Sequence, residues 1–110
     1  MFNIFQRTEK KYKDINSEDF LNEMTSSNAV VIDVRMPAEV SSGKIPGARN
    51  INIMGNFKGQ VQNLPKDKKY LIYCRSGNRS ASACQIMGDL GFEDVSNLRG
   101  GIISWPYDLA

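Results

Sequence analysis

One short stretch of the sequence combines a nucleophile with groups that bind anions. Cys74 ends an apolar run, residues 70–73, and a polar loop with one glycine and two arginines follows it. The loop leads into a segment rich in small residues, so the pattern predicts a buried strand, a tight loop and the start of a helix. Backbone N–H groups and the positive end of the helix dipole would then face residue 74. This arrangement favours a thiolate at Cys74.

The residues after Cys74 favour a reactive cysteine over one that only packs. A cysteine that closes an apolar strand is usually a small buried hydrophobe. That role gives no reason for the polar, cationic loop, so we identify Cys74 as the candidate catalytic nucleophile. Successive N–H groups of the loop can bind an anion, and its arginines add positive charge. The candidate substrate-binding residues are Arg75, Ser76, Gly77, Asn78, Arg79 and Ser80.

Composition indicates one small domain without a strong charge bias. The chain has 110 residues, of which 41% are hydrophobic and 24% charged, and its formal net charge is +2. So small a charge argues against nucleic-acid binding. The chain lacks an apolar run of membrane-spanning length and the long apolar region of a secretory signal. We expect a cytoplasmic protein with a loosely ordered lead-in, residues 1–11, and a single domain, residues 12–110.

The chain contains no histidine and only two cysteines. The lack of histidine excludes Ser-His-Asp and Cys-His catalysis and most zinc sites, so we expect neither a metal nor a cofactor. Cys84 is expected more than one turn inside the helix that follows the loop, as a buried hydrophobe. At that point it would lie beyond disulfide reach of Cys74, which argues against a redox switch formed by the two thiols.

Strands that alternate with helices predict an α/β domain whose central, mainly parallel sheet is flanked by helices. In such sheets ligands bind at the carboxyl ends of the strands, where Cys74 is expected. Asp33, at a strand end, is expected to pair locally rather than to act as an acid catalyst. Residues 54–63 are ambiguous because glycines interrupt them. The expected strands are Ile15 and residues 29–34, 51–53, 70–73 and 95–98, and the expected helices follow Asn16 or Ser17 and cover residues 37–42 and 80–90.

Four stretches of the sequence resemble, in the right order, the rhodanese-like (sulfurtransferase) domain family. The resemblance extends from about residue 15 to residue 105. Lys44 differs, because the family commonly has histidine at that position. The stretches are the loop 74–80, which resembles the active-site loop; residues 31–35, with an Asp-x-Arg end; residues 43–51, similar to Gly-His-Ile-Pro-Gly-Ala-x-Asn-Ile; and residues 98–105, similar to Leu-x-Gly-Gly-x-x-x-Trp.

The resemblance implies a rhodanese-like fold and sulfurtransferase activity. A sulfane sulfur would move from a donor such as thiosulfate to a thiophilic acceptor through a persulfide on Cys74. The implied partners are a small anionic sulfur donor and a thiol, cyanide or protein acceptor, with neither nucleic acid nor membrane. Sulfite is a weakly basic leaving group, so the first step needs no general acid, which agrees with a chain that lacks histidine.

Two other functions stay open at this point. A non-catalytic module that carries persulfide sulfur to a partner protein, or only binds one, needs the same loop. A cysteine-based phosphatase or arsenate reductase also uses a cysteine, a backbone cradle and an arginine at a helix N-terminus. That class places five residues between cysteine and arginine, whereas four separate Cys74 from Arg79. The shorter loop suits one sulfur better than a tetrahedral phosphate.

Overall fold

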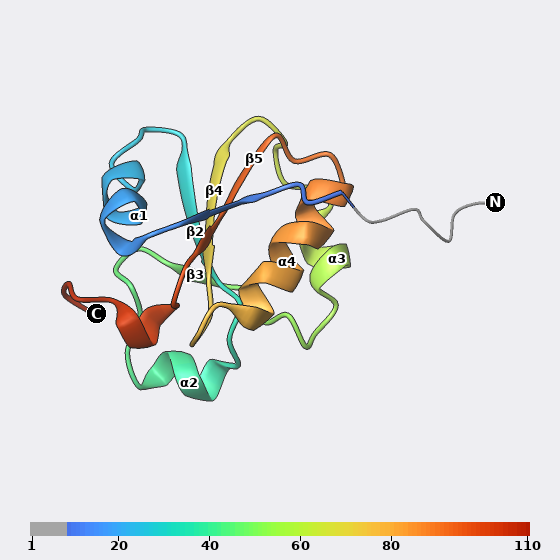
Figure 1. The fold of residues 1–110 in the computed structure, drawn as a ribbon. Helices are drawn as coiled ribbons and strands as arrows, with labels where there is room; N and C mark the ends of the chain where they lie inside the picture. The colour runs from blue at the N-terminus through green and yellow to red at the C-terminus, as the bar shows by residue number, and fades with distance from the viewer. Residues whose placement is uncertain (1–8) are drawn as a thin grey trace.

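In the computed structural model, which describes residues 9–110, five parallel strands form one sheet with helices on both faces (Figure 1). The strand order is β1-β5-β4-β2-β3. This arrangement confirms the predicted α/β class with a parallel sheet. The strands are β1 (Lys13–Ile15), β2 (Ala29–Asp33), β3 (Arg49–Asn50), β4 (Lys69–Tyr73) and β5 (Asp94–Leu98). The helices are α1 (Ser17–Glu23), α2 (Pro37–Ser41), α3 (Phe57–Val61), α4 (Asn78–Asp89) and a 3₁₀ helix (Ile102–Ser104).

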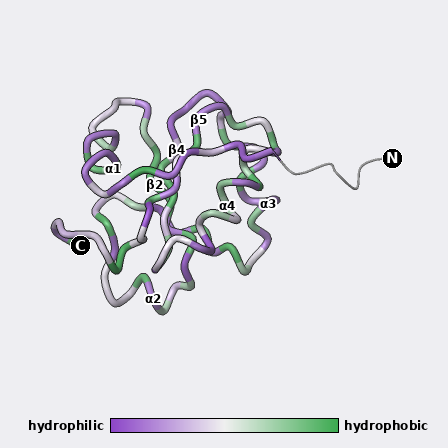
Figure 2. The backbone as a smooth tube through the Cα atoms, in the orientation of Figure 1, coloured by the Kyte–Doolittle hydropathy of each residue, from purple (hydrophilic) through white to green (hydrophobic). Residues whose placement is uncertain are grey.

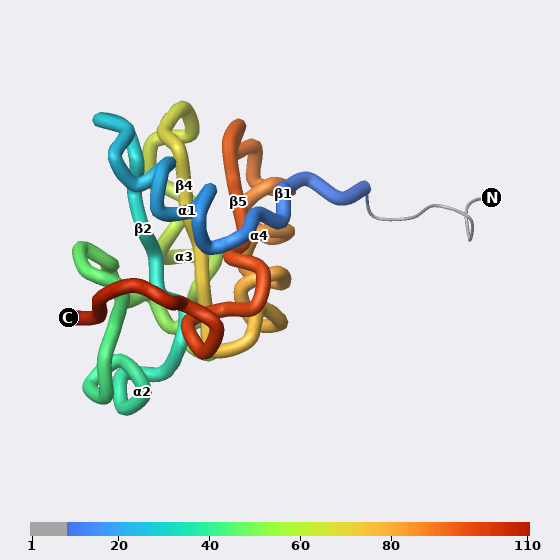
Figure 3. The backbone as a smooth tube through the Cα atoms, turned by 60° about the vertical axis from the view of Figure 1, so that its left-hand side comes forward, coloured from blue at the N-terminus to red at the C-terminus, as the bar shows by residue number. Residues whose placement is uncertain are grey.

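The core lies on both faces of the sheet, because successive side chains of the central strand β4 point in opposite directions. Tyr70 and Ile72 pack with residues of α3 and α4, and Leu71 and Tyr73 pack on the other face with residues of α1 and Trp105. Figures 1 and 3 show α3 and α4 on one side of the sheet and α1 with the C-terminal segment on the other. In Figure 2 hydrophobic stretches gather at the centre, where β2 and β4 run side by side.

Cys74 directly follows β4, at the carboxyl edge of the sheet. Because β4 lies between β5 and β2, the loop that joins it to α4 sits in the middle of this edge. β2 ends at the same level, since Asp33 pairs in register with Tyr73. The segments that follow β2 and β4 therefore meet at the edge where parallel sheets bind their ligands.

Two predicted elements differ from the structure by more than one residue. The short strand predicted at residues 51–53 is instead Arg49–Asn50, because only these residues lie opposite β2. Residues 51–53 continue past the carboxyl end of β2, although the N–H of Ile51 still donates to the carbonyl of Asp33. The helix predicted from residue 80 begins two residues earlier, at Asn78, because Gly77 takes a left-handed conformation and caps it.

Other expected elements agree with the structure. The side chain of Asn16, one of the two residues predicted to precede this helix, accepts a hydrogen bond from the N–H of Asp19 and so caps α1. The ambiguous residues 54–63 contain α3, whose Phe57 and Val61 are buried. None of the helices in residues 9–110 has the length and hydropathy needed to cross a membrane. The predicted lead-in falls largely on residues 1–8, which lie outside the described residues, so it stays a prediction.

Candidate active site

The sulfur of Cys74 lies in a cradle of hydrogen-bond donors at the N-terminus of α4. The N–H groups of Gly77 and Ser80 donate to Sγ at 3.1 and 3.3 Å, and the Ser80 hydroxyl donates at 3.2 Å. The Cys74 side chain is only 1% exposed. Burial by itself raises the pKa of the thiol, but these bonds and one from the Ser76 N–H bring the pKa of Cys74 below its ordinary value. The cradle thus favours a thiolate.

Two glycines and a backbone brace shape this loop. Gly77 has a φ of +110°, a conformation that glycine adopts without strain, and this turn aims its N–H at the sulfur. The N–H groups of Ile102 and Ile103 donate to the carbonyls of Cys74 and Arg75 at 2.9 and 3.1 Å. Gly101, with a φ of +66°, lies so close that a Cβ atom there would overlap the Arg75 carbonyl. The Gly-Gly turn after β5 therefore supports the Cys74 loop directly.

The two arginines of the loop have different environments. Arg79, at the start of α4, forms a bidentate ion pair with Glu39 of α2, with Nη1–Oε1 and Nη2–Oε2 distances of 2.7 and 2.9 Å. The hydrogen bond from Arg79 is the main reason that the pKa of Glu39 falls to about 2. Arg75 is exposed and lines a pocket of about 280 Å³ together with Glu39 and Ile103. Sequence reasoning missed Glu39, which lies 40 positions from Arg79.

The other candidate loop residues lie either in the cradle or on its rim. Ser76 and Asn78 are exposed, whereas Gly77 and Ser80 are buried against the sulfur. The structure therefore brings Gly77 and Ser80 into direct contact with Cys74, and it leaves Asn78 on the surface. The N–H of Ser76 also supports the thiolate.

A buried ion pair holds the neighbouring wall of the site. Asp33, at the end of β2, accepts from Arg35, with an Oδ2–Nη2 distance of 2.7 Å. Arg35 also donates to the carbonyl of Gly43 at 2.7 Å, and so ties the segment after α2 to the edge of the sheet. Asp33 is thus paired locally, as the sequence predicts. Lys44, at the position where the family commonly has histidine, donates to the carbonyl of Ala48 at 3.3 Å.

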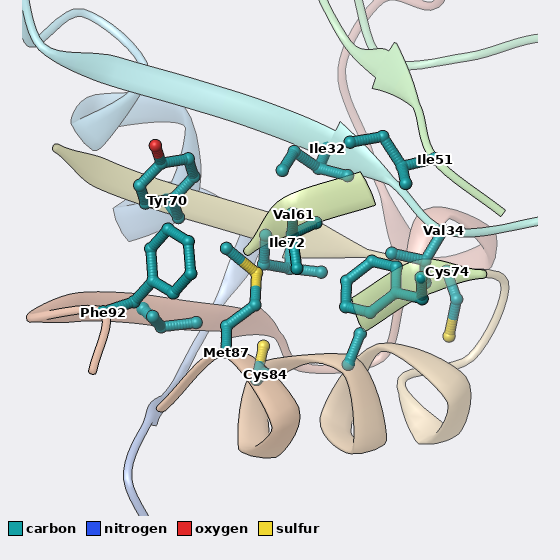
Figure 4. Packing of buried hydrophobic residues seen from close by; sticks show 13 residues of the cluster. Ile32, Val34, Ile51, Val61, Tyr70, Ile72, Cys74, Cys84, Met87 and Phe92 are labelled. Carbon is teal, nitrogen blue, oxygen red and sulfur yellow. The ribbon is translucent and has the colours of Figure 1, made fainter. Parts of the chain in front are cut away.

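Cys84 lies away from the cradle. It is fully buried in α4, and burial raises the pKa of its thiol. Figure 4 shows Cys84 beside Met87 and away from Cys74, which lies near Val34 at one end of the cluster. Both cysteines are free thiols. Within residues 9–110, no three histidine, cysteine or acidic side chains are grouped as metal ligands.

The alkylation rate of Cys74 by iodoacetamide is expected to inflect below the free-thiol pKa of about 8.5. Only the thiolate reacts, and the cradle stabilises it. Replacing Ser80 by alanine removes the hydroxyl donor, so the inflection should move up by about one unit. The measurement is the rate of label incorporation as a function of pH, with Cys74→Ser as the blank.

Ser82→Ala is the matched control, because Ser82 lies exposed on the same helix. Its inflection should equal that of the unmodified protein. Glu39 remains ionised across the neutral and alkaline range, since its pKa is about 2, and so does not contribute an inflection there. Equal curves for Ser80→Ala and Ser82→Ala would show that the cradle does not set the reactivity of Cys74.

The structure thus defines the class of the domain, a parallel α/β sheet that holds a buried cysteine in a cradle of hydrogen-bond donors at its carboxyl edge. The profile of the family described as "Rhodanese-like domain" matches residues 16–107. The chain therefore belongs to the rhodanese-like domain family, as its four motifs predict.

Relatives and solved structures agree with this assignment. A sulfurtransferase of Allochromatium vinosum is 40% identical over 93 residues, which cover 84% of this chain and 86% of the relative. The thiosulfate sulfurtransferase GlpE of Pseudomonas putida is 33% identical over 97 residues, 86% of each chain. The crystal structure of a rhodanese-related protein from Thermoplasma volcanium superposes with a TM-score of 0.79 at 35% identity, covering 90% of this chain and 98% of that one.

Proposed function

We propose that this protein is a rhodanese-type thiosulfate sulfurtransferase that works through a persulfide on Cys74. The observation that carries the proposal is the set of three donors on the Cys74 sulfur at the start of α4. The relatives named sulfurtransferase, one of them a thiosulfate sulfurtransferase, support the same reaction. A reducing compartment such as the cytoplasm would keep Cys74 free to react.

The reaction consists of two sulfur transfers. In the first, the Cys74 thiolate attacks the outer sulfur of thiosulfate and forms a new S–S bond. The S–S bond of thiosulfate breaks, sulfite leaves with the bonding electrons, and Cys74 carries a persulfide anion. In the second, a thiolate or cyanide attacks the terminal sulfur, and the Cys74 thiolate leaves. Sulfite and the stabilised thiolate are weak bases, so neither departure requires an acid catalyst.

Mass spectrometry of the intact protein tests the proposal. Exposure to thiosulfate should add one sulfur atom, and subsequent cyanide should remove it. Peptide mapping should place the added sulfur on Cys74. Cys74→Ser should gain no sulfur, whereas Cys84→Ala should gain one sulfur atom, as the wild-type protein does. Sulfur on Cys84 alone, or no gain at all, would contradict the proposed reaction.

An exposed apolar residue at the site favours a second candidate, a carrier that passes persulfide sulfur to a partner protein. Ile103 is 60% exposed and lines the same pocket as Arg75, so a protein acceptor would find both an apolar contact and a cation beside the loop. Turnover with thiosulfate and cyanide alone supports the enzyme, and transfer only to a partner supports the carrier. An assay with an aryl phosphate tests the phosphatase alternative, for which the loop is one residue short.

Charge substitutions at the rim are expected to change the KM for thiosulfate in opposite directions. Arg75→Ala removes an exposed cation and should raise this KM about threefold, and Arg79→Ala should also raise it. Glu39→Gln frees Arg79 from its ion pair and should lower it by a similar factor. The KM for an uncharged acceptor should change less. The measurement is initial-rate kinetics at two salt concentrations.

Added salt should reduce all three effects, because exposed charges are screened over about 10 Å at 0.1 M. Lys68→Ala is the matched control, since Lys68 is an exposed cation just before β4, at the opposite edge of the sheet. Its KM should not change. An equal loss toward charged and uncharged substrates in Arg75→Ala would mean that Arg75 only shapes the loop.

A further inference from the structure

A buried side-chain amide on β5 contacts the loop 74–80 from the side of the sheet. Asn97 is 3% exposed and pairs in register with Ile72 of β4, so its side chain lies on the sheet face that α4 covers. Its Nδ2 donates to the carbonyl of Gly77 at 3.3 Å. Gly77 is the residue whose N–H donates to the Cys74 sulfur.

The second N–H of the same amide is held by the edge strand. Nδ2 of Asn97 donates to Oδ1 of Asp14 at 2.9 Å, and the two residues face each other in the register of β1 and β5. Both hydrogens of the amide are thus directed, one to Asp14 and the other to Gly77. The bond to Asp14 fixes the orientation of the amide, since a flipped amide would set its oxygen against two acceptors.

The oxygen atom of this amide accepts no hydrogen bond from the described residues. No group of the described residues donates to Oδ1 of Asn97, although the atom is buried. A buried acceptor without a donor lowers stability, and an apolar side chain would avoid that loss. An asparagine at position 97 therefore does not serve the stability of β5. The two hydrogen bonds that its amide donates explain its presence.

We propose that Asn97, oriented by Asp14, is a positioning residue that holds the Gly77 turn so that its N–H points at the sulfur of Cys74. The carbonyl of Gly77 accepts from Asn97 and from the N–H of Ala81 at 3.1 Å, so it is fixed from the sheet and from the helix. Without the bond from Asn97, the carbonyl of Gly77 keeps, among residues 9–110, only its bond from the first turn of α4. The left-handed turn at Gly77 is then free to relax, and the cradle loses order.

The proposal rests on Cys74 as the nucleophile of the proposed function, but its test needs no sulfur donor. Asn97→Leu in the full chain should slow alkylation of Cys74 by iodoacetamide at neutral pH about three- to tenfold, because the inflection moves up by about 0.5 to 1 unit. Asn97→Ala should do the same, should the leucine variant fail to fold. If a folded Asn97 variant shows the same alkylation rate as a function of pH as the wild-type protein, the proposal is overturned, whatever the outcome with thiosulfate.

Ser96→Ala is the matched control within β5. Ser96 is fully buried beside Asn97 and pairs with Leu71, on the other face of the sheet. Its hydroxyl has no partner among the described residues, so its removal breaks no hydrogen bond. The alkylation curve of this variant should not move. A shift as large as that of Asn97→Leu would show a general effect of altering the strand and would overturn the proposal.

Two substitutions of Asp14 distinguish a positioning role from a purely electrostatic one. Asp14→Asn keeps an oxygen that accepts from Asn97 and should leave the alkylation curve in place, whereas Asp14→Ala should shift it up. A purely electrostatic effect has the opposite sign, because loss of an anion favours the thiolate in both variants. A downward shift in both therefore overturns the proposal. Other charges nearby are unchanged: Arg79 on α4, Glu39 on α2, the Asp33–Arg35 pair at the end of β2, and Lys10 and Arg99 near Asp14.

Discussion

Replacing Cys74 by serine is expected to lower the rate of sulfur transfer by about 10³-fold or more, to the limit of detection. A serine hydroxyl stays protonated where the cradle favours a thiolate, so it neither attacks thiosulfate nor carries a persulfide. The fold should persist, since an oxygen at this position still accepts from the N–H groups of Gly77 and Ser80. The measurements are thiocyanate formation from thiosulfate and cyanide, and thermal unfolding.

Cys84 provides the matched control for this result. Cys84→Ala removes a buried sulfur from the packed face of α4, so it should lower stability by about 1 kcal/mol and leave turnover near normal. Loss of the Cys74 thiol would then lower turnover, whereas loss of the Cys84 thiol would lower stability. Turnover that survives Cys74→Ser would show that sulfur is carried elsewhere. Turnover lost equally in both variants would point to a general loss of structure.

The cradle could be predicted from the sequence because it is local. An apolar strand, a cysteine, a glycine and a helix start follow one another within about ten positions, and the dipoles of such a turn converge on the cysteine. The two-sided burial of β4 was predictable for a similar reason, since an uninterrupted apolar run indicates a strand covered on both faces.

The partners of the loop could not be predicted, because they come from distant parts of the chain. Two arginines after Cys74 are visible in the sequence, but nothing in it shows that Glu39 of α2 neutralises Arg79. In the sequence Asn97 is only one of the polar residues of β5, and nothing there marks its contact with the loop. These contacts depend on the strand order, which places the ends of β2, β4 and β5 side by side.

Element boundaries failed where tertiary contacts decide them. Ile51 and Ile53 have strand propensity, yet the ladder is formed by the exposed Arg49 and Asn50, which pair with Ile32 and Asp33 at the end of β2. α4 begins at Asn78 rather than at Ser80, because the start depends on the left-handed turn of Gly77.

Gly101→Ala is expected to destabilise the protein by about 3 kcal/mol or more and to abolish most activity. Gly101 has a φ of 66° and a ψ of −169°, a region essentially limited to glycine, where a residue with a Cβ costs about 1 to 3 kcal/mol. The new methyl group would also overlap the backbone of Arg75 and Ser76, and such overpacking costs about 1 to 3 kcal/mol more. Because Ile102 and Ile103 brace Cys74 and Arg75 through backbone bonds, relief of the overlap must displace the loop that holds Cys74. Denaturant unfolding and turnover measure the two effects.

The Gly91→Ala variant distinguishes the steric overlap expected in Gly101→Ala from the strain of a positive φ. Gly91, after α4, also has a positive φ, of +98°, but a Cβ there meets no atom within 4 Å. This variant should lose only about 1 to 2 kcal/mol and keep its turnover. The difference between the two variants then reports the close approach of Gly101 to the loop. If both variants lose the same stability and both stay active, the Gly-Gly turn after β5 does not hold the cradle in place.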